Sequence, residues 1–258
     1  MNDLAKRTAS GIILIAVAAA CLLLGGFAFW LLTVVAALLM MAEWVALHTP
    51  GMARNKQIAQ FSLVVPLAIL GPLAAGPGFF ALGLIAGAAF FIAIVTRNGQ
   101  LGWGAIYVGI PVLALLMLRS QPGAAGLLLA FWAMALVWAT DIGAYFAGRT
   151  IGGPKIAPSI SPSKTWAGLI GGVIAATAFA FALHVWAGLP FRLVMWTPLL
   201  AVLAQVGDFY ESWLKRRAGV KDSGSLLPGH GGVMDRLDGL VPVAPVAAIL
   251  VELPRWLG

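Results

Sequence analysis

The sequence predicts an all-α protein, a polytopic bundle of transmembrane helices. Of its 258 residues 61% are hydrophobic and only 10% are charged, and long apolar runs recur from one end of the chain to the other. A soluble globular domain has about 25% charged residues, so the composition excludes that class. A helix of about 20 apolar residues is long enough to cross the hydrocarbon core of a bilayer. Repeated runs of this length therefore predict repeated crossings.

Apolar runs bounded by charged residues or by glycine and proline pairs predict about nine spans. In chain order they cover residues 11–24, 27–47, 58–75, 79–96, 104–119, 124–147, 166–187, 193–214 and 239–254. The first run follows Lys6 and Arg7, as the apolar part of a signal peptide does, but equally apolar runs continue to the C-terminus. We therefore interpret it as a span. The first and fifth runs are short for a core of about 30 Å.

The distribution of cations predicts that the N-terminus is cytoplasmic, because cytoplasmic loops carry an excess of lysine and arginine. With this orientation 13 of the 16 cations lie inside, and Arg119, Arg192 and Arg255 lie outside. Orientation and anionic lipid account for the net charge of +7, so nucleic acid is not an expected partner. The single cysteine, Cys21, excludes a disulfide framework and a thiolate metal cluster.

Acidic residues divide the chain into two parts. Residues 1–140 contain only Asp3 and Glu43, and the other seven of the nine acids follow. We expect residues 1–123 to form a helical scaffold, and residues 124–258 to form a catalytic membrane region with cytoplasmic loops 148–165 and 214–238. Ionised groups inside a bilayer are costly, so such acids normally face a bundle interior or an aqueous cavity.

The segment 212–238 combines cations, carboxylates and glycines in an otherwise apolar chain. Asp208 precedes it, with Glu211 and Ser212 on the same face of a helix because they are three and four residues further on. Asp235 and Asp238 repeat the spacing of three. Carboxylates bind divalent metals, cations bind phosphate and glycines allow close backbone approach. Together they predict a nucleotide-phosphate site, whereas the alternative is a set of ion pairs that anchors helix ends.

A second cluster, ISPSKTWAG at 160–168, places Ser163, Lys164 and Thr165 directly before a predicted span. Hydroxyls, a lysine and free backbone N–H groups at a helix N-terminus form an anion site. An ordinary N-cap beside a lysine that follows the positive-inside rule is the alternative. His230, in the sequence PGHGG, is a candidate for phosphate positioning, for proton transfer or for a turn.

These residues resemble the signature of the phosphatidate cytidylyltransferases, also called CDP-diacylglycerol synthases. The signature positions are filled by Ser212, Lys215, Arg216, Lys221, Asp222, Pro228, His230, Gly231, Gly232, Asp235, Arg236 and Asp238. Asp141, Tyr145 and the SPSKT segment look like further elements of that family, so the resemblance is strong over residues 138–240. Ala167 departs from it, because the family has a glutamate at this position.

The resemblance implies a multi-pass protein of the inner (cytoplasmic) membrane that transfers CMP from CTP to phosphatidate, giving CDP-diacylglycerol and pyrophosphate. It implies Mg2+, with a monovalent cation such as K+ as an optional second ion, and it allows a homodimer surrounded by membrane lipid. The implied metal ligands are Asp208, Asp235 and Asp238, and Lys164 and His230 join them as catalytic candidates. The implied substrate and phosphate contacts are Ser163, Thr165, Ser212, Lys215, Arg216, Lys221, Asp222, Gly231, Gly232, Arg236, Asp141 and Tyr145.

Two other functions stay open. A related CTP-dependent transferase or kinase that acts on a polyprenol or an archaeal-type lipid would use the same nucleotide chemistry. A cation-coupled transporter would also place acids in the membrane. It should carry them near mid-membrane in two related halves, whereas these gather in one half of the chain and toward one face. A lipid-nucleotide enzyme is therefore the preferred interpretation.

Overall fold

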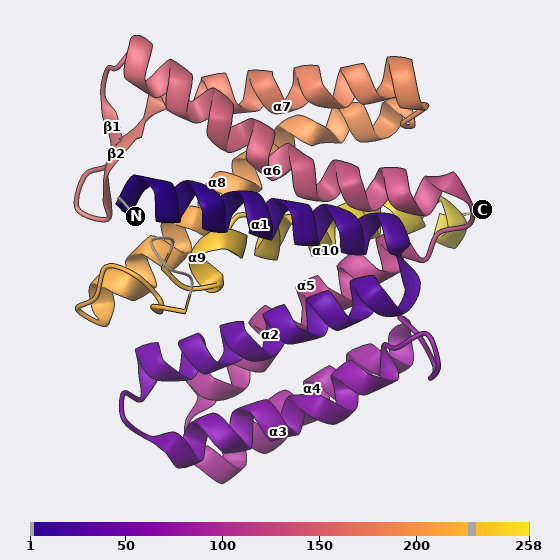
Figure 1. Cartoon of the computed structure of the whole chain (residues 1–258), viewed down its shortest axis with the longest axis vertical. Helices are drawn as coiled ribbons and strands as arrows, with labels where there is room; N and C mark the ends of the chain where they lie inside the picture. The colour runs from indigo at the N-terminus through magenta and orange to yellow at the C-terminus, as the bar shows by residue number, and fades with distance from the viewer. Residues whose placement is uncertain (1–2, 227–230, 258) are drawn as a thin grey trace.

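The computed structural model describes residues 3–226 and 231–257 (Figure 1). The described residues form ten α-helices and two short β-strands. In chain order these are α1 (Asp3–Leu24), α2 (Gly26–His48), α3 (Ala53–Ile69), α4 (Phe79–Thr96), α5 (Gly99–Arg119), α6 (Ala124–Thr150), β1 (Lys155–Ala157), β2 (Ser161–Thr165), α7 (Trp166–Ala187), α8 (Phe191–Arg217), α9 (Met234–Leu237) and α10 (Leu240–Leu257).

Each predicted apolar run overlaps a helix, so the helical prediction is confirmed, but the run 58–75 extends six residues beyond the end of α3 at Ile69. Six of these helices, α2, α4, α5, α6, α7 and α8, are long and apolar enough to cross a membrane. Shorter apolar stretches occur at Ser10–Leu24 and Leu240–Pro254. These lengths indicate an integral membrane protein, while nine crossings and a cytoplasmic N-terminus stay predictions.

The prediction of an all-α fold is wrong in the loop 148–165, where β1 and β2 form an antiparallel hairpin. Lys155 pairs with Thr165, and Ala157 pairs with Ser161. Proline restricts the preceding residue to extended conformations, and Pro158 and Pro162 act in this way here. The hairpin ends directly at α7, so it fixes the position of the lysine in β2.

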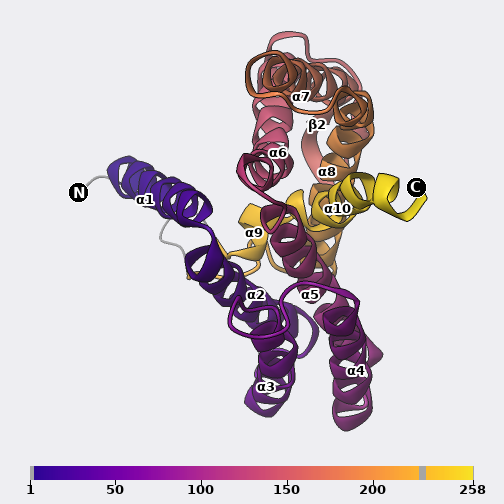
Figure 2. The same cartoon turned by 90° about the vertical axis from the view of Figure 1, so that its right-hand side faces the viewer.

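Two groups of helices lie on either side of a central pair. Figure 2 shows α6, α7 and α8 on one side, α2, α3 and α4 on the other, and α5 with α10 between them. Helices α6 and α7 approach closely through glycines, because a Cβ atom at Gly143 would clash with Ala175 and one at Gly171 with Ala147. Small residues allow such close packing of membrane helices. This contact holds the second half of α6 against the start of α7.

The polar segments gather at one end of the bundle. Figure 1 shows the β1–β2 hairpin, α9 and the start of α1 at the same end of the molecule, with the C-terminus at the other. The C-terminal end of α8 leads into the segment that precedes α9. The two predicted polar loops are therefore brought to one end of the helices.

Candidate active site

A cavity of about 540 Å³ lies where α6, β2, α7, α8 and α9 meet. Among its lining residues are nine that the sequence predicts for the site: Asp141, Tyr145, Ser163, Lys164, Thr165, Asp208, Asp235, Arg236 and Asp238. Three other residues with predicted roles, Ser212, Lys215 and Gly232, donate hydrogen bonds to the lining carboxylates, as described below, and Gly231 lies close to Asp235. The fold thus joins the two sequence clusters into one site.

Lys164 connects the hairpin to α8. Its ammonium group forms an ion pair with the Oδ2 atom of Asp208 and donates a hydrogen bond to Oε1 of Gln205 at 3.0 Å. The side chains of Lys164 and Asp208 are 20% and 28% exposed, so the pair is partly buried. Ser212 Oγ donates to Asp208 Oδ1 at 3.3 Å from the next turn of α8. Lys164 therefore points into the cavity, where an anionic ligand would meet it.

Thr165 is the N-cap of α7, as the alternative interpretation of this segment expected. Its hydroxyl oxygen accepts a hydrogen bond from the backbone N–H of Gly168 at 3.0 Å, and the side chain is buried. Ser163 is exposed at the cavity. A capped helix N-terminus beside a lysine retains the electrostatic features of an anion site.

Asp235 is the most densely hydrogen-bonded carboxylate of the site. Its Oδ1 accepts from the Lys215 ammonium at 2.6 Å, and its Oδ2 accepts from Gly232 N at 2.7 Å and from both N and Oγ of Ser223 at 2.9 Å. Burial opposes ionisation, but the bonds from Lys215 and from the backbone of Gly232 and Ser223 outweigh it and lower the pKa of Asp235. Asp235 therefore holds α8, α9 and the segment between them together.

Asp238 lies in a different electrostatic environment. Burial, together with the negative charges of Asp208 and Asp141, raises the pKa of Asp238 to about 6, although a hydrogen bond from Gly239 N opposes the shift. Within the described chain, both buried side-chain oxygens of Glu211 lack a hydrogen-bond partner, and Lys215 Nζ is 3.5 Å from Oε2. A cation bound near Asp238 would offset the repulsion between these carboxylates.

Several predicted residues lie away from the cavity. Arg216, Lys221 and Asp222 are exposed, and Arg216 donates a hydrogen bond to the Val220 carbonyl at 3.4 Å. Their assignment to phosphate binding stays a prediction that this arrangement does not support. His230 lies outside the described residues.

Three polar residues of this region were missed by the sequence reasoning. Gln205 and Arg149 line the cavity. Helical spacing could have found both, since Gln205 is three residues before Asp208 and Arg149 is four after Tyr145, whose hydroxyl accepts from Arg149 Nη1 at 2.9 Å. Glu43 is bonded to Ser223, 180 positions away in the chain, and no local pattern points to it.

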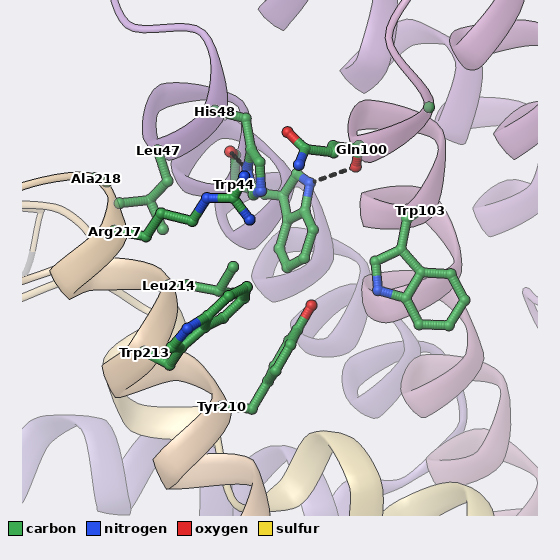
Figure 3. A pocket seen from close by; sticks show the side chains of 11 residues that line it. Trp44, Leu47, His48, Gln100, Trp103, Tyr210, Trp213, Leu214, Arg217 and Ala218 are labelled. Atoms are coloured by element: carbon green, nitrogen blue, oxygen red, sulfur yellow. Dashed lines mark hydrogen bonds between the residues drawn. The ribbon is translucent and has the colours of Figure 1, made fainter. Parts of the chain in front are cut away.

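A second cavity, of about 410 Å³, lies against the other face of α8 (Figure 3). Tyr210, Trp213 and Arg217 are spaced by three and four residues and face Trp44 of α2. The Arg217 guanidinium lies 5.5 Å from the centre of the Trp213 ring, and Trp44 Nε1 donates to the Gln100 carbonyl at 2.8 Å (Figure 3). This aromatic cavity has no predicted site residue among its lining residues, and α8 separates it from the acids.

The residues of the first cavity fit Mg2+ without forming a complete cage. Within the described residues, no group of three or more His, Cys, Asp or Glu side chains is arranged to hold a metal ion. Mg2+ is usually bound by one or two carboxylates, with substrate phosphates and water as the other ligands. The carboxylates of Asp208 and Asp238 beside a large cavity match that requirement.

Comparison with known proteins agrees with this chemistry. Residues 5–254 match the model of the "Cytidylyltransferase family". A phosphatidate cytidylyltransferase of Brucella suis is 37% identical over 249 residues, which cover 95% of this chain and 92% of that relative. Phosphatidate cytidylyltransferases of Bacillus subtilis and Pseudomonas aeruginosa are 40% and 39% identical over 60% and 62% of this chain, covering 58% and 60% of those relatives. Since the match spans almost the whole sequence, the chain belongs to the cytidylyltransferase family of enzymes.

Proposed function

We propose that this enzyme transfers CMP from CTP to phosphatidate at the cytoplasmic face of the inner membrane. A phosphate oxygen of the lipid attacks the α-phosphorus of CTP, a new P–O bond forms, and the bond between the α- and β-phosphates breaks. The products are CDP-diacylglycerol and pyrophosphate. The lipid phosphate is itself the nucleophile, so catalysis requires alignment and charge neutralisation rather than a nucleophilic side chain.

The observation that carries the proposal is the joining of phosphate-binding cations and carboxylates in one cavity at the polar end of the helices. Lys164, Arg149 and Arg236 line the cavity together with Asp208 and Asp238. Lysine and arginine bind phosphate oxygens, and carboxylates hold the divalent ion that accompanies a nucleotide. Family membership and the names of the relatives support CTP and phosphatidate as the substrates.

Mg2+, when bound, would neutralise charge on the CTP phosphates. We propose Asp208, Asp235 and Asp238 as the carboxylates available to it. Asp208 and Asp238 are the better candidates for direct contact, because four donor atoms already surround the oxygens of Asp235, one of them the Ser223 hydroxyl that Glu43 shares. The amide donor of Gln205 is buried, lines the cavity and has no hydrogen-bond acceptor among the described residues, so it is available to a substrate oxygen.

The test is a transfer assay with purified protein, phosphatidate, Mg2+ and CTP labelled at either the α- or the γ-phosphate. We expect only the α-label to enter the lipid fraction, and we expect excess EDTA to abolish the transfer and Mg2+ to restore it. Transfer of the γ-label would instead identify a lipid kinase.

Parallel reactions with a polyprenol and with an ether-linked archaeal-type phosphatidate test the alternative lipids. The proposed substrate is wrong if one of these is used much faster than diacyl phosphatidate. Full activity in EDTA would refute the metal requirement and leave the transfer itself standing. Omitting K+ from the buffer tests the optional monovalent cation.

A further inference from the structure

Glu43 is a buried acid in the part of the chain that the sequence predicts to be a scaffold. It lies in α2 with 8% of its surface exposed, next to Trp44, which lines the aromatic cavity. The next acidic residue in the chain is Asp141. A carboxylate in such a position is costly unless its oxygens are well compensated.

Hydrogen bonds from the segment around α9 compensate Glu43. Its Oε1 accepts from Val233 N at 2.8 Å, and its Oε2 accepts from Met234 N at 2.8 Å and from Ser223 Oγ at 3.0 Å. Among the described residues, Glu43 forms no ion pair with a lysine, arginine or histidine within 4.0 Å. Its charge is therefore balanced by donors of the segment that carries the family signature.

Two glycines make this contact sterically possible. A Cβ atom at Gly232 would lie 2.5 Å from Oε2 of Glu43, and one at Gly224 would lie 2.9 Å from Oε1. Real Cβ atoms essentially never come that close to another heavy atom. Gly232 is one of the signature positions, so its lack of a side chain serves the contact with α2 as well as the bond from its N–H to Asp235.

Ser223 connects Glu43 to the cavity. Its Oγ lies 3.0 Å from Glu43 Oε2 and 2.9 Å from Asp235 Oδ2, and its single hydrogen can be donated to only one carboxylate at a time. Asp235 in turn accepts from Lys215 of α8. The chain of contacts runs from α2 through the loop and α9 to α8.

We infer that Glu43 is a positioning residue for the active site: it fixes residues 223–224 and 232–234 from the side of α2, so that Asp235, Arg236 and Asp238 face the cavity. This inference rests on the proposed function, because it assigns Glu43 to the same nucleotide site. It also gives the N-terminal helices a role in catalysis beyond that of a scaffold.

The test compares Glu43→Gln with Glu252→Gln in the full-length protein. Glu252 of α10 is a matched control, because it is also a buried carboxylate, 9% exposed. It accepts a hydrogen bond from Gln121 Nε2 at 2.5 Å, and it lines neither cavity. Hydrogen exchange measures the amides of Val233 and Met234, which we expect to exchange at least about tenfold faster in Glu43→Gln. They should be unchanged in Glu252→Gln.

Kinetics supply the second measurement. We expect Glu43→Gln to raise the KM for CTP about tenfold and to leave the KM for phosphatidate within about twofold, because the displaced groups face the proposed nucleotide site. A smaller folded fraction would lower the apparent kcat and leave both KM values unchanged. Since Glu43 and Ser223 are hydrogen-bonded to each other and hold the same segment, the losses from Glu43→Gln and Ser223→Ala should be less than multiplicative in the double variant.

Each outcome decides one question. Wild-type amide protection and a wild-type KM for CTP in Glu43→Gln would overturn the inference. If Glu43→Gln does not fold, Ser223→Ala alone must show the faster exchange and the raised KM, and normal values there would also overturn it. If the wild-type protein does not transfer CMP, the proposed function fails, while hydrogen exchange still shows whether Glu43 holds the segment.

Discussion

Replacement of Lys164 by glutamine is the sharpest single test of the cavity. The change removes a cation that forms an ion pair with Asp208 and a hydrogen bond with Gln205, and it leaves a neutral, polar side chain that is one bond shorter. A donor lost from a preorganised, partly desolvated site costs about 2 to 4 kcal/mol of transition-state stabilisation. This corresponds to a loss of about 30- to 1000-fold in kcat/KM.

The lower half of that range is the better estimate for this site. Both partners of the ion pair are partly exposed, at 20% and 28%, so water screens part of the charge. A loss of about 30- to 200-fold is therefore expected in the transfer of α-labelled CMP, with membrane insertion and detergent extraction unchanged. Lys164→Arg should recover only part of the activity, because arginine keeps the charge and changes the donor geometry.

Lys56→Gln is the control. Lys56 is an exposed cation near the start of α3, assigned to the same side of the membrane and far from the cavity residues in the chain. Its loss should leave kcat/KM within about twofold of the wild type. If both glutamine variants have near-normal activity, Lys164 serves only as a membrane anchor, and the site is confined to residues 208–238.

Three further predictions use other features of the site. Asp208→Asn should abolish transfer in a protein that still elutes as a single species in detergent, and wild-type turnover would exclude Asp208 as a metal ligand. In a cysteine-free background, a cysteine at exposed Ser159 should react with an impermeant maleimide only after the membrane is opened, whereas labelling of intact cells would refute the orientation. Gly231→Ala should lower kcat/KM at least about tenfold, because the residue has φ +80° and its Cβ would lie 2.7 Å from Asp235 Oδ2. Gly219→Ala, with φ +73° and open space around the position, is its control, and equal loss in both would assign the effect to backbone strain alone.

The helices were predictable because each is encoded locally by an apolar run. The sequence of α4, FFALGLIAGAAFFIAIVT, has no charged residue, and its predicted and observed bounds coincide. The hairpin was not predictable in the same way, since β1 has only three residues and carries no alternation of apolar and polar side chains. Its conformation depends on prolines and on the adjoining start of α7. Its polar composition by itself predicts a loop.

The site was predictable wherever its residues lie close together in the sequence. Lys164 and Thr165 are adjacent, and Asp208 and Ser212 are one turn apart on α8, so spacing alone placed each pair. The relation between the hairpin and α8 is tertiary, because it depends on the close packing of α6 and α7. Glu43 is the extreme case, because its partners lie about 180 to 190 positions away.

Asp235 shows why a signature residue can serve two roles that sequence cannot separate. A metal ligand and a loop anchor are both carboxylates at a signature position, and replacing either by Asn would inactivate the enzyme. In the structure four donor atoms lie within hydrogen-bond distance of Asp235, three of them in the segment that Glu43 also holds. Loss of activity in Asp235→Asn would therefore fit either role. Among the described residues, no backbone N–H donates a hydrogen bond to the Asp208 side chain. A loss of activity in Asp208→Asn therefore reports on the charge in the cavity. The metal assignment thus depends on Asp208, and the architecture of the signature segment depends on Asp235 and Glu43.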